Sequence, residues 1–326
     1  MLAALMFLFI GMVTDRDAAL PLISIEATPF STLDGRPHRR GCAQLLTGLT
    51  LEGEKGFGGI SAMQLKGDQL HLLSDAGMIF TGRVTRNEQG LVTDLTEMSR
   101  TALVDEKGQA LKRPRSDSEA FILEGEKALI SFEADDRIQW MHQHGPRWHP
   151  GEVIYQSTDP LFGTNQGIEA LTQLKNGGLL AVAEAKTAEG TSPLLLGAQE
   201  GGAWTWREAA YRAAPDFSVT DAATDPKTGD VYILERAFRW RRGPRARLVR
   251  LEAKALVAAQ AGDIRILEGT EVTRLSFWDG IDIMEGLALD RNPDGDLIVH
   301  LISDDNYKNF QRTVLLGIVI EEGREG

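Results

Sequence analysis

Acidic side chains recur at matching places in five segments of the sequence. Each segment combines a stretch of small, polar and apolar residues, a turn containing Gly, Asp or Asn, and an apolar run that ends in an acid. In a hairpin, the numbers of facing residues have a constant sum set by the turn, so the turn predicts which side chains meet. This sum places Glu169 opposite Glu184 and Glu119 beside Glu133. The segments are Gly58–Asp75, Ser116–Glu133, Asn165–Glu184, Val219–Glu235 and Asp282–Asp304.

The other three segments follow the same arithmetic. The predicted pairs are Asp221 with Glu235, Ser61 with Asp75, and Glu285 with the corner at 303–305. If the five hairpins surround one axis, every pair lies at the same end of the central channel. The expected funnel then contains as many as nine carboxylates: Asp75, Glu119, Glu133, Glu169, Glu184, Asp221, Glu235, Glu285 and Asp304.

Carboxylates this close raise one another's pKa and lower stability unless positive charge neutralises them. Hard divalent cations that take about six to eight oxygen ligands, above all calcium, suit such a cluster. We therefore predict calcium as the cofactor, and Glu169 and Glu184 as the candidates for a general base. Two other interpretations stay open: the carboxyls are protonated, or acids end these strands only because strand ends meet water.

Basic and polar residues lie next to the same positions and give a second possible role to the funnel. They either pair with the acids or bind an anionic substrate, because calcium and arginines together bind and polarise a phosphate ester. The candidate substrate-binding residues are Arg115, Lys186, Arg236, Asn306 and Arg312.

The elements that must position these residues are strands. The five acidic or polar positions recur at intervals of 50 to 64 residues, the length of a four-stranded antiparallel sheet, which predicts a propeller blade. The predicted third strands are Ile79–Thr85, Ile138–His142, Leu194–Gln199, Arg247–Leu251 and Thr313–Ile320. The predicted fourth strands are Leu91–Glu97, Val153–Gln156, Thr205–Ala210 and Ile264–Glu268, and Glu252–Ala261 is the one convincing helix.

The fold class is therefore all-β, a single β-propeller of four-stranded blades. Five blades are countable, and the strand Cys42–Leu51 is expected to close the ring by pairing with Thr313–Ile320. A sixth, degenerate blade that uses Leu22–Ala27 is the alternative. The expected organisation is a signal peptide or anchor at 1–20, the propeller at 21–320 and a flexible tail at 321–326.

Composition and charge exclude several classes of protein. The chain of 326 residues carries 35 basic and 47 acidic side chains, a net charge of −12 that argues against nucleic acid as a general partner. We therefore interpret the arginine-rich segment Arg236–Arg245 as a solvated loop between strands and not as a nucleic-acid-binding segment. One cysteine, Cys42, excludes an internal disulfide, a CxxC zinc site and an iron–sulfur cluster.

The N-terminus suggests export. The apolar run Leu2–Val13 is too short for a spanning helix of about 20 residues and matches the apolar core of a signal peptide. We expect a periplasmic protein without stable membrane insertion after processing, or one anchored by residues 2–13. The oligomeric state is left open.

No familiar catalytic motif is present. The sequence has no GxSxG elbow, HExxH motif, P-loop or dinucleotide fingerprint. Six short segments of the sequence form a recognisable set: GGISAM at 58–63, SDSEAFI at 116–122 with Arg115 before it, NQGIEAL at 165–171, LERAF at 234–238, MEGLAL at 284–289 and SDDNYKNFQRT at 303–313. Together these segments resemble the bacterial phytase-like family, described as having esterase-like activity of phytase.

The resemblance spans about 58–320. It implies a β-propeller, export, and hydrolysis of phosphate or other esters, with a calcium-dependent phytase-like mechanism by analogy. Two positions depart from the family pattern: Ala120 stands where a glycine is usual, and Ile283 where an asparagine is common. The second change lies two residues before the predicted ligand Glu285 and is expected to weaken a ligand position.

The sequence is compatible with three functions. The first is a calcium-dependent hydrolase of a small anionic phosphate ester. The second is a metal-dependent lactonase or carboxylesterase on the same ring, which needs a more apolar pocket. The third is a non-catalytic propeller that binds a ligand or partner and holds a structural metal.

Overall fold

Strands make up 62% of the protein and helices 4%, so the all-β prediction is confirmed. The computed structural model describes residues 20–29, 39–40, 43–134, 136–157, 167–308 and 310–321. The predicted export segment, apart from Leu20, and all but the first residue of the predicted tail lie outside these residues, as does Cys42. Among the residues described, no helix is long and apolar enough to cross a bilayer.

The five predicted hairpins are present, and each extends into a four-stranded antiparallel group that we call a meander. The first meander contains β4 (Ile60–Lys66), β5 (Gln69–Ser74), β6 (Met78–Arg86) and β7 (Val92–Leu103). The second contains β8 (Ser118–Glu124), β9 (Lys127–Phe132), β10 (Arg137–His144) and β11 (Arg147–Gln156). The third contains β12 (Ile168–Gln173), β13 (Leu179–Ala183), β14 (Ser192–Glu200) and β15 (Ala203–Tyr211).

The last two meanders complete the order. The fourth contains β16 (Ser218–Thr224), β17 (Val231–Arg239), β18 (Gly243–Leu251) and β20 (Thr270–Ser276). The fifth contains β21 (Ile283–Arg291), β22 (Leu297–Asp304), β23 (Thr313–Ile320) and, from the other end of the chain, β3 (Ala43–Gly53). The smaller elements are β1 (Ile25–Pro29), β2 (Arg39–Arg40), β19 (Ile266–Leu267), the helix α1 (Ala253–Ala261) and the short 3-10 helix η3 (Phe277–Asp279).

One predicted strand was wrong. The fourth strand of the fourth meander is β20, and not Ile264–Glu268, from which only β19 forms a strand. The strand β19 pairs instead in parallel with β15 of the third meander. The stretch Thr270–Ser276 alternates polar and buried side chains, the pattern of a half-buried strand, whereas Ile266 is 37% exposed.

The turns of the five inner hairpins share a backbone requirement. Each contains a glycine with a positive φ, between 57° and 89°, which side-chain-bearing residues rarely adopt. These glycines are Gly67, Gly125, Gly177, Gly229 and Gly295. Because a turn of this kind recurs once in every inner hairpin, the turn residues predict the positions of the hairpins in the sequence.

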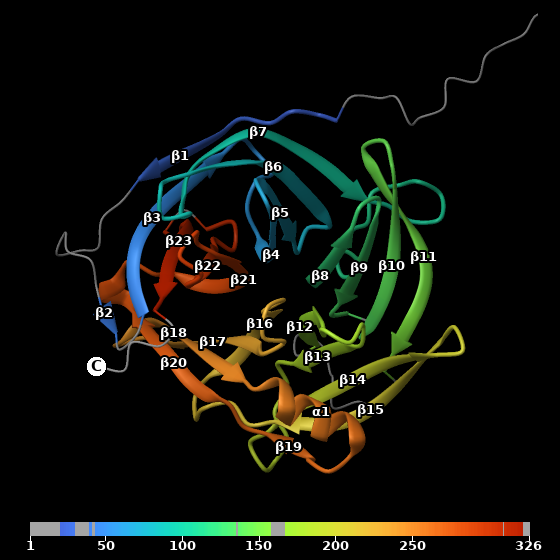
Figure 1. Ribbon diagram of the computed structural model, residues 1–326. Helices are drawn as coiled ribbons and strands as arrows, with labels where there is room; N and C mark the ends of the chain where they lie inside the picture. Colours follow the sequence, from blue (N-terminus) through green and yellow to red (C-terminus); the bar gives the residue numbers. More distant parts are fainter. Residues whose placement is uncertain are drawn as a thin grey trace, which may run out of the picture.

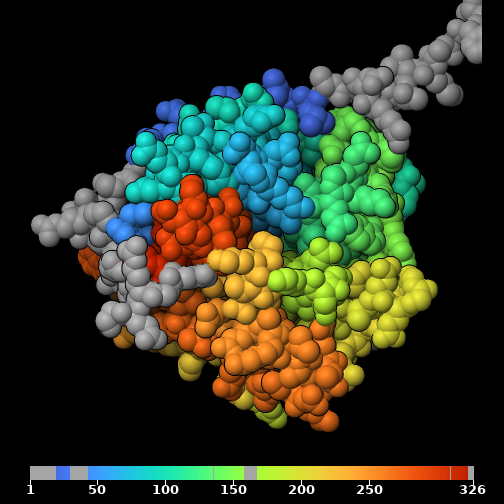
Figure 2. Space-filling model, in the orientation of Figure 1, coloured from blue at the N-terminus to red at the C-terminus, as the bar shows by residue number. Residues whose placement is uncertain are grey.

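The innermost strands of the five meanders form a ring of contacts. β4 contacts β8, β8 contacts β12, β12 contacts β16, β16 contacts β21, and β21 returns to β4. Figure 1 shows these strands nearest the centre, and Figure 2 shows consecutive segments of the chain surrounding the middle of one face. The buried apolar side chains follow the same plan, since each of the five large clusters draws on two neighbouring meanders.

The two ends of the described chain meet in the fifth meander. β3 pairs antiparallel with β23 over Ala43–Leu51 and Thr313–Ile320, the pairing expected from the sequence. Residues of the proposed sixth blade, Leu22–Ala27, lie instead at the outer edge, where β1 pairs with β3.

Buried His300 on β22 provides a test of this packing. Its side chain is 1% exposed, and neither ring nitrogen has a hydrogen-bond partner among the described residues. Burial, with a smaller contribution from Arg86, lowers the pKa of His300 from 6.5 to about 3. Stability from this neutral imidazole is therefore present above pH 6.5 and is lost as the pH falls toward 3.

We expect His300→Leu to raise the free energy of unfolding by about 1–2 kcal/mol at neutral pH, because a buried unpaired polar group costs roughly that much. The variant should also lose part of the acid sensitivity between pH 6.5 and 3. Urea unfolding at several pH values measures both. The matched control is His71→Leu, which removes the hydrogen bond between Nδ1 and Thr81 Oγ1 (3.0 Å) and should give no gain. A destabilised His300→Leu protein would contradict the interpretation.

Candidate functional site

A β-bulge lies at the same point of every inner hairpin. In each, the pairing register shifts by one residue, so that one residue of the innermost strand has no partner opposite it. The bulged residues are Ser61, Glu119, Glu169, Thr220 and Glu285. Four of them are the positions chosen from the sequence, and bulges of this kind commonly re-aim side chains next to active sites.

The returning strand supplies the second member of each pair. On the returning strand, the residue meant is the one directly after the partner of the residue that precedes the bulge. In the five meanders this residue is Asp75, Glu133, Glu184, Arg236 and Asp304. Three meanders therefore place two acids at one end of the ring, and the first places Ser61 and Asp75 there. The fourth meander differs, because it contributes Thr220 and Arg236 in place of an acidic pair.

This arrangement corrects two predicted ligands. Asp221 and Glu235 are each one residue away from the bulge position, and a one-residue shift moves a side chain to the other face of a strand. The carboxylate of Asp221 accepts the amides of Ala222 (2.8 Å) and Leu287 (2.7 Å). Asp221 therefore ties β16 to β21 and lines a cavity of about 510 Å³ in the other half of the central channel.

Glu235 is fully buried inside the fourth meander. Tyr211 Oη donates a hydrogen bond to its carboxylate (2.6 Å), and the Arg247 guanidinium forms an ion pair with it. Both oxygens of Glu235 are occupied by these partners and by the amide of Ala214 (3.4 Å). The predictions of Asp221 and Glu235 as funnel ligands were wrong for this reason.

The tightest group of acids contains one residue that the sequence reasoning missed. Asp117, Glu119 and Glu133 each offer an oxygen atom within 4.8 Å of the other two. Asp117 lies just before β8, and its backbone oxygen accepts the amide of Glu133 (2.9 Å). The SDSE segment of the sequence contains both Asp117 and Glu119, but the periodicity of the pairs predicts Glu119 alone.

Burial and mutual repulsion raise the pKa of the acids around this group. The pKa of Glu133 rises to about 6, through burial and the charge of Asp117, and that of Asp75 rises to about 6, mainly through burial. Burial and the charge of Asp75 raise the pKa of Asp304 to about 7, although the Asn306 amide opposes the shift. Burial, opposed by Arg236 and reinforced by Asp304, raises the pKa of Glu285 to about 8.

Glu119 and Glu169 connect the acids of the ring electrostatically. Burial raises the pKa of both well above 4.5, and Glu119 and Glu285 add to the shift of Glu169. Repulsion from Glu133 and Asp117 adds to the shift of Glu119. The acids therefore form one interacting cluster, which we call the acidic mouth: Asp75, Asp117, Glu119, Glu133, Glu169, Glu184, Glu285 and Asp304.

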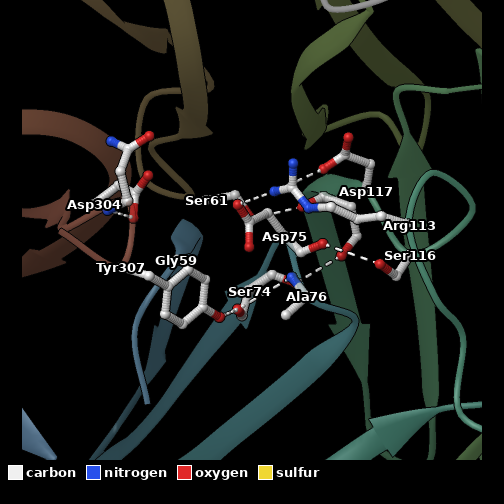
Figure 3. Close-up of polar contacts among 12 residues, drawn as sticks. Gly59, Ser61, Ser74, Asp75, Ala76, Arg113, Ser116, Asp117, Asp304 and Tyr307 are labelled. Atoms are coloured by element: carbon white, nitrogen blue, oxygen red, sulfur yellow. Dashed lines mark hydrogen bonds and ion pairs between the residues drawn. The ribbon is translucent and has the colours of Figure 1, made fainter. Parts of the chain in front are cut away.

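Two arginines partly neutralise the acidic mouth. The Arg236 guanidinium lies 3.3 Å from Glu184 and 3.1 Å from Glu285, so it bridges the third and fifth meanders. Arg113 was not chosen from the sequence. Its guanidinium forms ion pairs with Asp75 and, at 3.2 Å, with Asp117, and Figure 3 shows it between these carboxylates.

The other predicted substrate-binding residues are placed differently. Arg115 is exposed and forms an ion pair with Glu106 at 3.9 Å. The Lys186 ammonium donates to the carbonyl oxygen of Phe217. Arg312 donates to the carbonyl of Gly280 at 3.4 Å. None of these three contacts involves the acidic mouth.

Asn306 does lie at the mouth. Its amide donates to Asp304 Oδ1 (2.7 Å), and it lines a cavity of about 460 Å³ beside the acids. Asp75, Arg113 and Ser116 lie on the same wall. Tyr307 completes it, with its hydroxyl 3.0 Å from Ser74 Oγ (Figure 3).

The residues present fit a hard divalent cation. All donors in the Asp117, Glu119 and Glu133 group are carboxylate oxygens, the ligand type that such cations prefer. Next to this group, the buried atom Asp75 Oδ1 has no hydrogen-bond partner among the described residues. Among the described residues, Arg113 and Arg236 form ion pairs with four of the eight carboxylates, so a cation at the others would stabilise their ionised form.

The fold and the site together define an all-β protein with an acidic mouth whose carboxylates suit a hard divalent cation. Residues 55–307 match the phytase-like family with the description "esterase-like activity of phytase", and the chain belongs to this family. No protein with a curated description matches the chain.

Several solved structures are similar over most of the chain but at low sequence identity. The PQQ-bound aldose sugar dehydrogenase from Streptomyces coelicolor is 12% identical, with a TM-score of 0.45, over 88% of this chain and 100% of that one. A thermostable family-43 glycoside hydrolase is 13% identical, with a TM-score of 0.45, over 80% and 89%. A putative 6-phosphogluconolactonase from Bacteroides uniformis is 10% identical, with a TM-score of 0.37, over 86% and 82%.

The raised pKa values predict how stability depends on pH. Glu285 changes from 4.5 to about 8 on folding, and Asp304 from 3.8 to about 7. Between these limits the folded state binds more protons than the unfolded state, so the free energy of unfolding should fall as the pH rises. We expect chelator-treated protein to be less stable at pH 8 than at pH 5 in urea unfolding.

Calcium should reverse this loss. Because protons and cations compete for the same oxygens, the gain in stability from calcium should be larger at pH 8 than at pH 5. Magnesium at the same concentration is a control for ionic strength and charge, since it dehydrates reluctantly. Stability that rises from pH 5 to pH 8 without calcium would contradict the predicted electrostatics.

Proposed function

We propose that the protein is a calcium-dependent hydrolase of small phosphate esters, and that its five meanders are the blades of a closed five-bladed propeller. The proposed closure is supported by the ring of inner-strand contacts and by the β3–β23 pairing. The observation that carries the function is the group of Asp117, Glu119 and Glu133 in an acidic mouth that also holds Arg113 and Arg236.

Asp117, Glu119 and Glu133 would hold the calcium ion, with the free oxygen of Asp75 beside them. A bound calcium ion would act as a Lewis acid on a phosphoryl oxygen. The carboxylates would hold the ion at one end of the channel, where the bulges of β4, β8, β12 and β21 aim the side chains.

The basic side chains for phosphate are Arg113 and Arg236. A guanidinium offers paired N–H donors that match two phosphate oxygens. Arg113 is 60% exposed and borders the cavity of about 460 Å³, so it can contact a ligand without leaving Asp75 and Asp117. Arg236 is held between Glu184 and Glu285, and it supplies the second guanidinium of the proposed phosphate site.

Glu169 and Glu184 divide the proton transfers. Burial, reinforced by the charge of Glu119, raises the pKa of Glu169 well above its usual range and favours the protonated form that a general acid needs. Glu184, in an ion pair with Arg236, takes the role of general base toward water. The sequence prediction gave both residues the base role, and the different environments separate them.

The exchange Glu184→Gln should lower kcat for p-nitrophenyl phosphate by about 100-fold or more, the usual loss when a general base is removed. The matched control is Glu189→Gln in the exposed loop after β13, which should keep the wild-type rate. Near-ultraviolet circular dichroism checks that both variants are folded. An unchanged kcat in Glu184→Gln would remove this residue from the mechanism.

Substrate choice separates the alternatives. Chelator-treated protein should hydrolyse p-nitrophenyl phosphate only after calcium is added, and p-nitrophenyl acetate and a simple lactone slowly or not at all. Preferred turnover of the acetate or lactone would favour a carboxylesterase or lactonase. Absence of all turnover, together with calcium binding, would favour the non-catalytic propeller.

We also propose that the protein is exported to the periplasm. Support comes only from the apolar run Leu2–Val13. Cell fractionation and the mass of the mature chain test this proposal, and full-length protein in the cytosol would contradict it.

A further inference from the structure

The arginine-rich segment noted in the sequence forms the tip of a hairpin at the mouth end of the ring. β17 passes Arg236 in the acidic mouth and continues through Phe238 and Arg239 before it turns back into β18. Three further residues of extended strand carry this tip about 10 Å beyond Arg236. The end of β20 runs beside it, because Arg245 pairs with Ser276.

Four large aromatic side chains are exposed on these two strand ends. Trp240 is 90% exposed, Trp278 67%, Phe238 59% and Phe277 46%. They lie close together, because Phe277 lies against Gly243 of the hairpin and its ring centroid is 5.8 Å from that of Trp278. Phe238 pairs with Pro244, the residue that follows Gly243. Exposed aromatic groups on this scale mark an interaction surface.

The same tip carries uncompensated positive charge. Arg241 and Arg242 are exposed, and neither has an ion-pair partner among the described residues. Arg239 is paired with Asp216. The neighbouring acid Asp279 is fully buried and accepts hydrogen bonds from Ser276, so it does not neutralise the tip. We call Phe238, Trp240, Arg241, Arg242, Phe277 and Trp278 the aromatic–arginine tip.

We propose that the aromatic–arginine tip docks the protein on an anionic phospholipid surface, with the acidic mouth at the same end. A projecting hairpin that combines exposed Trp with Arg suits the bilayer interface, where the rings lie at headgroup level and the guanidinium groups contact anionic lipids. The chain as a whole has a charge of −12, so the tip is the region that such a surface attracts. This is binding to the interface and not insertion across it.

Two features favour lipid over nucleic acid as the occupant. The tip is a protruding turn and not a groove along which a strand runs, and its positive charge is confined to the turn.

The test is co-sedimentation of the full chain with vesicles in the presence of chelator, so that calcium does not bridge the acidic mouth to lipid. Vesicles of equal parts phosphatidylcholine and phosphatidylglycerol are compared with vesicles of phosphatidylcholine alone. We expect binding to the first only, release by added salt, and a blue shift of the tryptophan emission on binding.

Matched variants locate the contact. Each Arg near an anionic surface strengthens binding about fivefold, so Arg241→Gln with Arg242→Gln should weaken it about 25-fold. The control, Lys127→Gln with Lys227→Gln, removes the same charge from exposed turns at the opposite end of the ring and should bind like wild type. Trp240→Ala with Trp278→Ala should weaken binding and abolish the blue shift.

Failure of wild type to bind the anionic vesicles, or equal loss in the tip and control variants, would overturn the proposal. Binding of a short DNA duplex through the same arginines, without vesicle binding, would overturn it in favour of nucleic acid. The test measures no turnover and contains no calcium, so its result does not depend on the proposed hydrolase activity.

Discussion

Replacing Glu119 by Gln should lower the affinity for calcium by at least about 100-fold, because even residues that only support metal ligands usually contribute about 10- to 100-fold. Glu119 is the bulged residue of β8, and it lies within 4.8 Å of ligand oxygens from both Asp117 and Glu133. The amide of Gln keeps the shape of the side chain but removes its charge. Hydrolysis of p-nitrophenyl phosphate at a fixed low calcium concentration should fall in the same proportion.

The control for this exchange lies on the same strand. Glu124 ends β8 at the opposite end of the channel and is exposed. Glu124→Gln removes the same charge from the chain and should leave calcium affinity unchanged. Competition with a fluorescent calcium chelator measures both variants. Equal affinity in Glu119→Gln and wild type would remove the group of Asp117, Glu119 and Glu133 as the calcium site.

Glu235→Ala should destabilise the fold by about 3–5 kcal/mol, the usual cost of breaking a buried ion pair at one partner. The Glu235 carboxylate is fully buried and holds Arg247 and the Tyr211 hydroxyl between the third and fourth meanders. Without it, the Arg247 guanidinium, whose side chain is 12% exposed, keeps only Glu271 as an ion-pair partner among the residues that the structure describes. Urea unfolding gives the change in free energy.

Two further measurements separate this structural role from the predicted ligand role. Calcium affinity of the folded Glu235→Ala protein should equal that of wild type, because the carboxylate lies outside the acidic mouth. The double variant Glu235→Leu with Arg247→Met should recover most of the lost stability, since apolar pairs often replace buried ion pairs without loss. A large fall in calcium affinity in the single variant would restore Glu235 as a ligand.

The sequence predicted the hairpins well because their signal is local. Each inner turn needs a glycine with positive φ, and apolar runs of strand length flank it. The return of β3 to β23 was also predictable, because one unpaired strand at each end of the repeat leaves few other partners. The strand Ile264–Glu268 was misplaced because two short β-branched stretches follow α1, and the choice between them depends on packing.

The site was predictable only to within one residue. Turn arithmetic assumes a continuous ladder, whereas a bulge adds one residue to the inner strand of every hairpin. In four meanders the bulged residue is itself an acid or a serine, so residue type identified the correct position despite this error. In the fourth, Asp221 and Glu235 matched the pattern by type, and the true positions Thr220 and Arg236 did not.

Arg113 shows a second reason why the sequence did not predict every residue of the site. It precedes Pro114 in the loop before β8, two residues from the chosen Arg115, and spacing does not distinguish the two arginines. The path of the loop turns Arg113 toward Asp75 and Asp117 and leaves Arg115 near Glu106. Such a contact, between residues of two meanders and a connecting loop, depends on tertiary structure that local sequence does not specify.

The most direct test of the proposed function combines binding and turnover on one sample. Chelator-treated wild-type protein is titrated with calcium in a calorimeter, and aryl phosphate hydrolysis is measured at each calcium concentration. We predict that binding and turnover saturate together, at the same calcium concentration. Calcium binding without hydrolysis of the phosphate ester, or hydrolysis that continues in chelator, would contradict a calcium-dependent phosphate ester hydrolase.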